Sequence, residues 1–598
     1  MRGRLLWAAL LPALVTPPLR ALGRFAAKEV AETPPTRKTE VSRSAIGPAP
    51  GQSAIGGEHP LLAVMQDELT LSMKQLVSPE GVRPYFLQYS ITDEKEVMIS
   101  ATLEAITGDN VNHSRVLDVD LRCGDYAQDN TRQIRGEDGS DSYYLGGSFA
   151  TLPLNDDPLA TRQNLWLLTD EEFKDAVERL AQVQANLKVK VEEEDPSDDF
   201  SREAPSVHVG PWLETPMDRK ALADRVRRLS QRFRGQALIY GSGVAVSGKA
   251  TNRLTVNSEG TKLQLGHGWW RIGIQASTIA EDGMELWQYT SFDAHAPDRL
   301  PDDATIERAI DQVIADVLAL RAAPLVEPYT GPAILLNRAS GVFFHEIFGH
   351  RIEGHRQKDV EEGQTFAKKI GQEVLPSFLS IVDDPSRKQL AGLDLNGHYA
   401  FDDEGVPGQP ARLVENGVLR SFLLSRVPTR GFTKSNGHGR REPGNRVVAR
   451  QGNLFVESAK PVSFSDLKAR LVIECKRQNK EYGLLFRDIS GGFTTTQRWT
   501  PQAFKVLPIL VYRVFVDGRP DELVRGVDIV GTPLTCFSKI LATGDDPAVF
   551  NGVCGAESGM VPVSAVSPSI LVEQIEVEKK QKAQNRPPIL PAPIGLRR

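Results

Sequence analysis

The order of helix-type and strand-type segments is the strongest constraint on the fold of this chain. Apolar residues recur every three or four positions in residues 60–76, 173–187, 222–233 and 306–317, and this spacing predicts amphipathic helices. Shorter runs of β-type composition separate the helices, and after Pro328 strands and turns dominate. We therefore expect an α+β fold, in which an N-terminal domain of mixed helices and strands precedes a C-terminal domain dominated by antiparallel β-sheet.

Turn and cap residues refine this outline. Thr169, with a Glu three residues later, has the pattern of a capping box, which predicts that a helix begins there. The Thr-Pro pair at 215–216 predicts another helix start, because proline is favoured at the first helical position. An Asn-Gly pair at 416–417 and an Asp-Gly pair at 517–518 lie between apolar runs, as in tight hairpins. The DDEG run at 402–405 is interpreted as a turn between strands.

The first residues have the three parts of a secretory signal. Arg2 and Arg4 supply positive charge, residues 5–15 are apolar, and residues 21–23 offer small side chains at a cleavage site. We expect residues 1–23 to be a signal peptide that directs export to the periplasm or the extracellular space. Without that signal the protein would stay in the cytoplasm.

Composition marks the remaining boundaries. Residues 24–60 include a stretch rich in Pro, Gly, Ser and Thr, which is typical of a linker. Residues 579–598 are charged and rich in proline, which predicts a disordered tail. The folded part then divides at Pro328 into an N-terminal domain, residues 61–328, and a C-terminal domain, residues 329–578.

Charge, hydropathy and cysteine usage exclude several classes of protein. The chain has 71 Lys and Arg against 77 Asp and Glu, and this net charge of −6 argues against a non-specific nucleic-acid binder. No apolar run reaches the ~18 residues that a membrane span requires. Four cysteines in 598 residues are too few for a disulfide scaffold, and they form no CxxC pair. These cysteines are Cys123, Cys475, Cys536 and Cys554.

Residues 345–350 carry the densest chemical signal of the chain. His345, Glu346 and His350 form an HExxxH pattern, although the whole chain has only ten histidines. Neutral imidazoles are good Zn²⁺ ligands, and a carboxylate beside one of them can act as a general base. Zn²⁺ lowers the pKa of a water ligand toward ~7, which favours attack of that water on a carbonyl. The pattern indicates a metal-site helix in the C-terminal domain.

The spacing of the two histidines conflicts with a regular helix. Residues at positions i and i+5 lie about 140° apart around a helix that turns about 100° per residue. The imidazoles can converge on one metal ion only if the helix bulges or breaks between them, and Gly349 is the residue that would permit this. The alternative is an amphipathic helix in which two polar positions are histidines by chance.

A zinc site also needs a third protein ligand from elsewhere in the chain. Cys554 lies between glycines at positions 552 and 555, which allow close approach of the backbone. It could equally be an ordinary buried cysteine, and Cys475, Cys536 and several carboxylates compete for the role. Spacing alone leaves the third ligand undecided.

Several motifs together resemble those of the TldD/PmbA family of zinc metallopeptidases. The segment GVFFHEIFGHRIEGHR at 341–356 is similar to the family's HExxGHxxEG pattern. Further agreement comes, in chain order, from DDEG at 402–405, ENGVL at 415–419, GGF at 491–493, and CG followed by GMVPV at 554–563. The resemblance covers residues 61–578 and is strongest from Gly331 onward.

The resemblance implies roles for individual residues and for the protein. His345, His350 and Cys554 would bind Zn²⁺, Glu346 would be the general base, and an open fourth position would hold water. The substrate would be an unfolded or extended peptide, and the site would lie in a chamber formed by a homodimer or by a heterodimer with a related subunit. Two alternatives remain, a non-hydrolytic peptide-binding subunit of the same family and a metal-dependent hydrolase of a non-peptide bond. Substrate-binding residues are not identified.

Two positions depart from the family pattern. His355 stands where the family often has Asp, and we interpret it as a surface residue or as one that supports the ligands from outside. Ala556, Glu557 and Ser558 replace a run that usually contains Lys after the CG pair.

Overall fold

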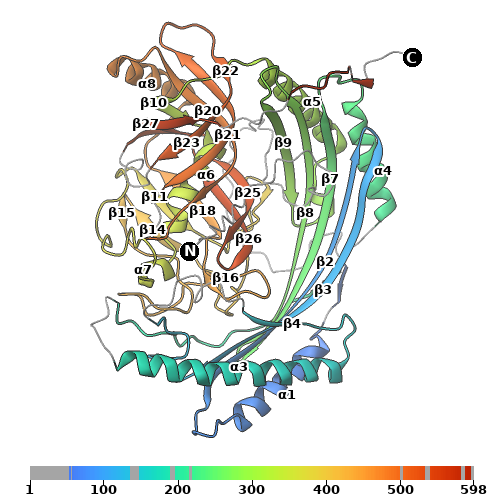
Figure 1. The fold of residues 1–598 in the computed structure, drawn as a ribbon, viewed down its shortest axis with the longest axis vertical. Helices are drawn as coiled ribbons and strands as arrows, with labels where there is room; N and C mark the ends of the chain where they lie inside the picture. Colours follow the sequence, from blue (N-terminus) through green and yellow to red (C-terminus); the bar gives the residue numbers. More distant parts are fainter. Residues whose placement is uncertain are drawn as a thin grey trace, which may run out of the picture.

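The computed structural model describes residues 53–55, 57–134, 147–188, 195–214, 218–498, 503–531, 539–580, 586–590 and 592–593. The expected signal peptide, most of the linker, the expected helix start at 215–216 and Cys536 lie outside these residues. Within them the fold is α+β, as predicted, with a helix-and-strand region followed by a β-rich region that lies beside it (Figure 1). No helix in the described part of the chain is long and apolar enough to cross a bilayer.

One long, curved sheet dominates the N-terminal region (Figure 1). Its strand order is β4-β3-β2-β7-β8-β5, with β9 also paired to β8. The strands are β2 (Pro84–Thr102), β3 (Ala105–Cys123), β4 (Ser148–Thr151), β5 (Val207–Val209), β7 (Gly241–Asn257), β8 (Lys262–Ile279) and β9 (Glu285–Ala294). All neighbours are antiparallel except β5 and β8. A separate two-stranded sheet joins β1 (Ser53–Ile55) to β6 (Trp212–Glu214).

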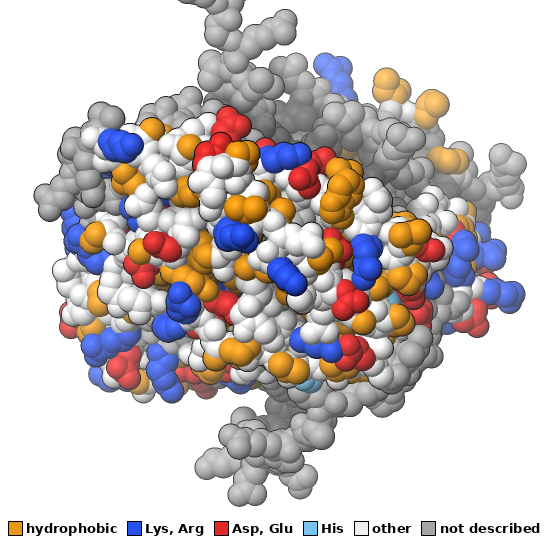
Figure 2. Space-filling model, turned by 90° about the horizontal axis from the view of Figure 1, so that it is seen from below, with side chains coloured by type: hydrophobic (Ala, Val, Ile, Leu, Met, Phe, Trp, Pro, Cys, Tyr) orange, Lys and Arg blue, Asp and Glu red, His pale blue; other side chains and the backbone are white. Residues whose placement is uncertain are grey.

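In the described part of the chain, four helices pack on this sheet through apolar faces at the predicted spacing. They are α1 (Pro60–Gln75), α3 (Pro158–Leu187), α4 (Arg219–Ser230) and α5 (Asp303–Ala322), with the 3₁₀ turns η1 (Gln231–Phe233) and η2 (Pro297–Arg299). Leu62 of α1 and Leu165 of α3 share one apolar cluster, whereas Leu229 of α4 and Ile310 of α5 share another with Trp270. Seen from the α1–α3 end, charged and apolar side chains are interspersed over the surface (Figure 2).

The predicted helix start at Thr169 is wrong. Helix α3 begins eleven residues earlier at Pro158, where the Asp157 side chain caps it by accepting the Ala160 N–H at 2.7 Å. Thr169 is a buried residue inside the helix, and its hydroxyl bonds the Leu165 carbonyl and the Tyr89 hydroxyl. The Asp-Pro start and the apolar stripe that follows it override the local capping-box pattern.

The C-terminal region contains two larger sheets. The eight-stranded sheet has β10 (Tyr329–Leu335), β19 (Pro461–Val462), β20 (Tyr482–Thr494), β21 (Phe504–Phe515), β22 (Glu522–Val524), β23 (Val527–Gly531), β24 (Ile540–Gly544) and β27 (Ile570–Lys579). The six-stranded sheet has β11 (Leu379–Asp383), β14 (Ala411–Glu415), β15 (Val418–Leu419), β18 (Asn453–Ser458), β25 (Ala548–Ala556) and β26 (Gly559–Ser567). The short strands β12 (Gln389–Leu390), β13 (Leu393–Asp394), β16 (Gly439–Arg440) and β17 (Val448–Ala449) form two further pairs.

Helix α6 (Asn337–Ile347) lies between these two sheets. It contacts β20 and β21 of one sheet and β25 and β26 of the other. Every residue from Ala339 to Ile347 is buried, so the helix is enclosed on all sides. The remaining helices are the short α7 (His355–Lys358) and α8 (Phe464–Arg477), which packs on the eight-stranded sheet through Leu467, Leu471 and Cys475.

The DDEG run at 402–405 forms a turn, as predicted, and also contacts the N-terminal sheet. Asp402 accepts backbone N–H groups of Glu404, Val406 and Gly439, which fixes the turn. Arg253 of β7 donates to the Asp402 carbonyl at 2.9 Å and pairs with the Asp403 carboxylate. The turn therefore fastens the C-terminal region to the middle of the long sheet.

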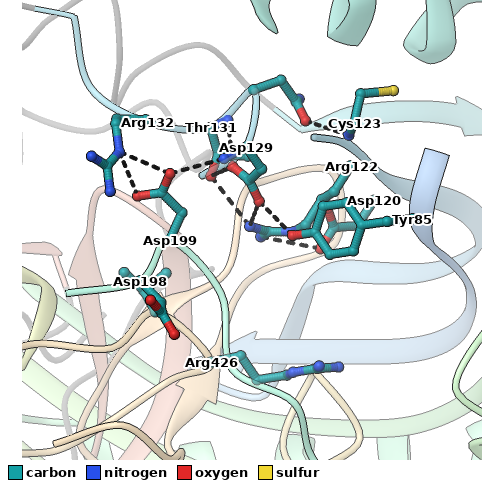
Figure 3. Close-up of polar contacts among 12 residues, drawn as sticks. Tyr85, Asp120, Arg122, Cys123, Asp129, Thr131, Arg132, Asp198, Asp199 and Arg426 are labelled. Atoms are coloured by element: carbon teal, nitrogen blue, oxygen red, sulfur yellow. Dashed lines mark hydrogen bonds and ion pairs between the residues drawn. The ribbon is translucent and has the colours of Figure 1, made fainter. Parts of the chain in front are cut away.

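A second polar cluster joins the N-terminal sheet to the segment that follows α3 (Figure 3). The buried Asp129 carboxylate accepts from Tyr85 at 2.7 Å and from Arg122 at 3.1 Å. The backbone N–H of Asp129 donates to the Asp199 carboxylate at 2.9 Å, and Arg132 donates to the Asp199 carboxylate at 2.9 Å as well. Because each of these buried charges has a partner of opposite sign, pairing offsets part of the cost of removing them from water.

Gly248 provides a test of the sheet's packing. A Cβ at this position would overlap the ring of its cross-strand neighbour Trp270, which is almost fully buried. We expect Gly248→Ala to cost about 1–3 kcal/mol through overpacking and to lower the thermal unfolding midpoint. Gly243→Ala on the same strand is the control, because a Cβ there would only touch Gln275 at 3.6 Å. Equal midpoints for the two variants would contradict the prediction.

Candidate metal centre

The helix that carries His345 breaks before it reaches His350. Helix α6 ends at Ile347, and the 3₁₀ turn η3 (Gly349–Arg351) follows and carries His350. The buried Arg351 guanidinium donates to the carbonyls of Glu346 and Ile347, and so caps the end of α6. The expected break between the two histidines is thus confirmed, and it brings the two imidazole centroids to 5.1 Å.

Gly349 allows this break for a reason that the sequence did not suggest. Its backbone is not in the left-handed region; instead, a Cβ on Gly349 would overlap the side-chain amide of Gln451. Gln451 is itself buried and its amide N–H points to the His345 carbonyl at 3.4 Å. A larger residue at position 349 would therefore displace the buried Gln451 side chain from its place against the turn.

Cys554 on β25 lies beside the two histidines. Its Sγ is 3.3 Å from Nε2 of His350, and one ligand atom from each of His345, His350 and Cys554 lies within 4.8 Å of the others. All three side chains are buried. Cys123 and Cys475 lie in apolar clusters, where burial raises the pKa of each thiol, to about 12 for Cys123 and about 11 for Cys475.

The electrostatics of the site favour a thiolate. Burial raises the pKa of Cys554, but His350, Arg450 and His345 outweigh burial and hold that pKa well below its ordinary value. Burial in turn lowers the pKa of His350, and the Cys554 and Glu353 charges reverse the direction and raise it well above its ordinary value. Two imidazoles and a thiolate are a donor set that suits Zn²⁺, so these residues fit the metal that the sequence predicts.

Glu346 is buried on α6 next to the candidate ligand residues. Burial raises the pKa of its carboxyl group, which the charges of His345 and His350 partly offset. A Cβ at Gly492 on β20 would lie 2.8 Å from Cγ of Glu346, so that glycine leaves room for the side chain. A carboxyl group with a raised pKa beside a metal site is suited to accept and return a proton.

Two further residues, Glu353 and Arg450, contact the candidate ligand residues. Nδ1 of His350 lies 3.4 Å from the fully buried Glu353, which is the usual outer-shell arrangement for a metal-binding histidine. Arg450 donates to the Cys554 carbonyl at 2.8 Å. Glu353 could have been found from its spacing of three after His350, whereas nothing in the sequence near Arg450 points to Cys554.

His355 is not at the surface. It is buried and hydrogen-bonded to Glu557, one of the three residues that replace the family's Lys-containing run. The two departures from the family pattern therefore contact each other. Glu353, His355 and Glu557 also offer ligand atoms within 4.8 Å of one another, but the Arg356 guanidinium already pairs with both carboxylates.

Comparison with known proteins gives a consistent picture. Residues 328–579, which include His345, Glu346, His350 and Cys554, match the family model for the PmbA/TldA metallopeptidase C-terminal domain. A Buchnera aphidicola protein named metalloprotease TldD homolog is 27% identical over 252 residues, which are 42% of this chain and 48% of that protein. A Saccharolobus solfataricus protein named zinc metalloprotease TldD homolog is 26% identical over 253 residues, or 41% of this chain and 51% of that protein.

The fold extends beyond that matched segment. The crystal structure of TldE from Thermococcus kodakarensis covers 86% of this chain and 100% of its own, with a TM-score of 0.55 and 15% identity. At this identity the match shows a shared fold. By sequence, the matched segment spans about half the length of the two curated relatives.

The packing of Gly349 against Gln451 gives a test of how the site is built. We expect Gly349→Ala to displace the η3 turn and to weaken Zn²⁺ binding by about 10–100-fold, as the loss of a supporting contact does. The double variant Gly349→Ala, Gln451→Ala removes the overlap and should recover most of the affinity. Competition with a chromophoric chelator measures both. An unchanged affinity in the single variant would refute the packing role of Gly349.

Proposed function

This chain belongs to the TldD/PmbA family, and from that premise we propose that it is a zinc-dependent peptidase that hydrolyses unfolded or extended peptides. The observation that carries the proposal is that the buried side chains of His345, His350 and Cys554 lie close together, with Glu346 next to His345 on helix α6. A non-hydrolytic peptide-binding subunit would have no need of this donor set, so the donor set supports the enzyme.

His345, His350 and Cys554 would hold the metal. When bound, Zn²⁺ supplies Lewis acidity, which acidifies a water and polarises an amide carbonyl. The carboxylate of Glu346 accepts a proton from the attacking water, and the resulting carboxyl group then returns it to the leaving amine nitrogen. The burial that raises the pKa of Glu346 favours the first of these transfers, because it makes the carboxylate a stronger base.

The surroundings of the site keep these groups in place. Glu353 holds the His350 ring through Nδ1, which leaves Nε2 directed toward Cys554. Helix α6 is enclosed by two sheets, so the side chains of His345 and Glu346 cannot swing into solvent. The peptide substrate and a dimeric assembly with a second copy or a related subunit remain part of the proposal.

The role of Glu346 is tested by Glu346→Gln, which keeps the shape of the side chain but cannot take up a proton. We expect peptide cleavage to fall about 10²–10⁴-fold, because general base catalysis contributes that much. Zinc content, measured by atomic spectroscopy, should be unchanged. The exposed Glu373→Gln is the matched control and should cleave as the wild type does. Cleavage retained by Glu346→Gln would remove Glu346 from the mechanism.

The role of Cys554 is tested by Cys554→Ala, for which we expect loss of zinc. Removal of a direct ligand should weaken Zn²⁺ binding by more than the ~10–100-fold that an outer-shell contact contributes. Cys475→Ala is the control, because it removes a buried thiol that lies in an apolar cluster of α8. Stoichiometric zinc in purified Cys554→Ala would rule this residue out as a ligand.

A further inference from the structure

The Arg356 guanidinium lies among three carboxylates next to the candidate metal site. Its Nε donates to Glu353 at 2.8 Å, Nη1 to Glu362 at 2.7 Å and Nη2 to Glu557 at 2.7 Å. Arg356, Glu353 and Glu362 are buried, and Glu557 is nearly so. A buried guanidinium with three carboxylate partners uses all its donor directions in a fixed geometry.

Two of these carboxylates come from the two segments that supply metal ligands. Glu353 follows His350 by three residues and contacts its Nδ1 at 3.4 Å. Glu557 follows Cys554 by three residues, in the two-residue turn between β25 and β26. Contacts therefore lead from His350 to Glu353, then to Arg356, and from Arg356 to Glu557, three residues after Cys554. The path closes because the Sγ of Cys554 lies 3.3 Å from Nε2 of His350.

A second arginine strengthens the same connection. Arg450 donates to the Cys554 carbonyl at 2.8 Å and to the Ser558 hydroxyl at 2.8 Å, and its Nε lies 3.7 Å from Glu353. Both arginines thus join Glu353 to the β25–β26 turn. The third partner of Arg356, Glu362, lies on a different segment, which pairs with Gln497. Among the residues that the structure describes, Glu362 makes no hydrogen bond or ion pair with His345, His350 or Cys554.

We propose that Arg356 is a positioning residue that joins the His350 turn to the Cys554 hairpin through Glu353 and Glu557, and so preorganises the metal ligands. His350 and Cys554 are 204 positions apart in the chain, so their approach depends on contacts between the two segments that carry them. With the guanidinium in place, the His350 turn and the Cys554 hairpin are held together before the metal binds. Metal affinity is higher because binding then has less of the chain to order.

His355 completes the arrangement and explains the sequence departure after Cys554. The imidazole of His355 bonds one oxygen of Glu557 while Arg356 bonds the other, so the carboxylate is held from both sides. A residue without a carboxylate at position 557 would leave both partners without this acceptor in a buried setting, which is costly.

The proposal rests on the zinc site of the proposed function, and Glu557→Gln tests it against the matched control Glu362→Gln. Each variant removes one carboxylate charge from the same guanidinium at the same distance of 2.7 Å. We expect Glu557→Gln to lower the Zn²⁺ affinity about 10–100-fold, as outer-shell changes do, and Glu362→Gln to leave it within about threefold. Competition with a chromophoric chelator gives both values.

A cobalt spectrum separates positioning from general damage to the fold. Co²⁺ bound in place of Zn²⁺ should give a weaker or shifted thiolate band in Glu557→Gln but the wild-type band in Glu362→Gln. Arg356→Lys keeps the positive charge but loses the planar arrangement of guanidinium donors. The Zn²⁺ affinity of this variant should therefore lie between those of the wild type and Glu557→Gln. Arg356→Lys also serves as the test variant if Glu557→Gln fails to fold.

The outcomes distinguish this inference from the proposed function. Equal zinc affinity and equal cobalt spectra for Glu557→Gln and Glu362→Gln, with normal zinc binding by the wild type, would overturn the positioning role alone. Failure of the wild-type protein to bind zinc at all would overturn the metal site and the positioning role together.

Discussion

The enclosure of helix α6 between two sheets is the constraint on which the rest of the site depends. Because all of its residues from Ala339 to Ile347 are buried, the helix cannot place His345 and Glu346 in solvent, and both must find polar partners inside the protein. The break after Ile347 and the cap by Arg351 turn the chain so that His350 meets the same space. The cluster of His345, His350 and Cys554 is thus a consequence of how two polar side chains, those of His345 and Glu346, are accommodated in an apolar layer.

Charge balance explains why the surroundings of this cluster contain so many ionised groups. A buried thiolate and the carboxylate of Glu353 would each be costly alone. Burial raises the pKa of Glu353, yet Arg356 and His350 bring it down to about 2, and Arg450 contributes to lowering the pKa of Cys554. The arginines therefore favour the ionised forms of Glu353 and Cys554. For Glu346, in contrast, burial raises the pKa and so favours the protonated form.

The sequence predicts the parts of this protein whose causes are local. A spacing of about 140° requires a break between His345 and His350 if both are to reach one metal ion, and the helices α1 and α5 follow from their apolar stripes. The capping box at Thr169 fails because an equally local signal, Asp157 before a proline, starts the helix earlier. Arg356, Arg450 and Glu557 could not be placed, since their partners lie on segments that only the tertiary fold brings together.

The same limit applies to the way in which the N-terminal region supports the metal-site segment. Helix α7 begins at His355, and its Lys358 donates to the Asp198 carbonyl at 2.7 Å, in the segment held by the Asp129 cluster. Gln133 donates to Asp359 just after α7 at 3.2 Å. The segment that carries His350, Glu353 and Arg356 is therefore fixed at its start by α6 and at its end by the N-terminal region. The long sheet, though remote from the candidate chemistry, becomes part of what holds the ligand geometry.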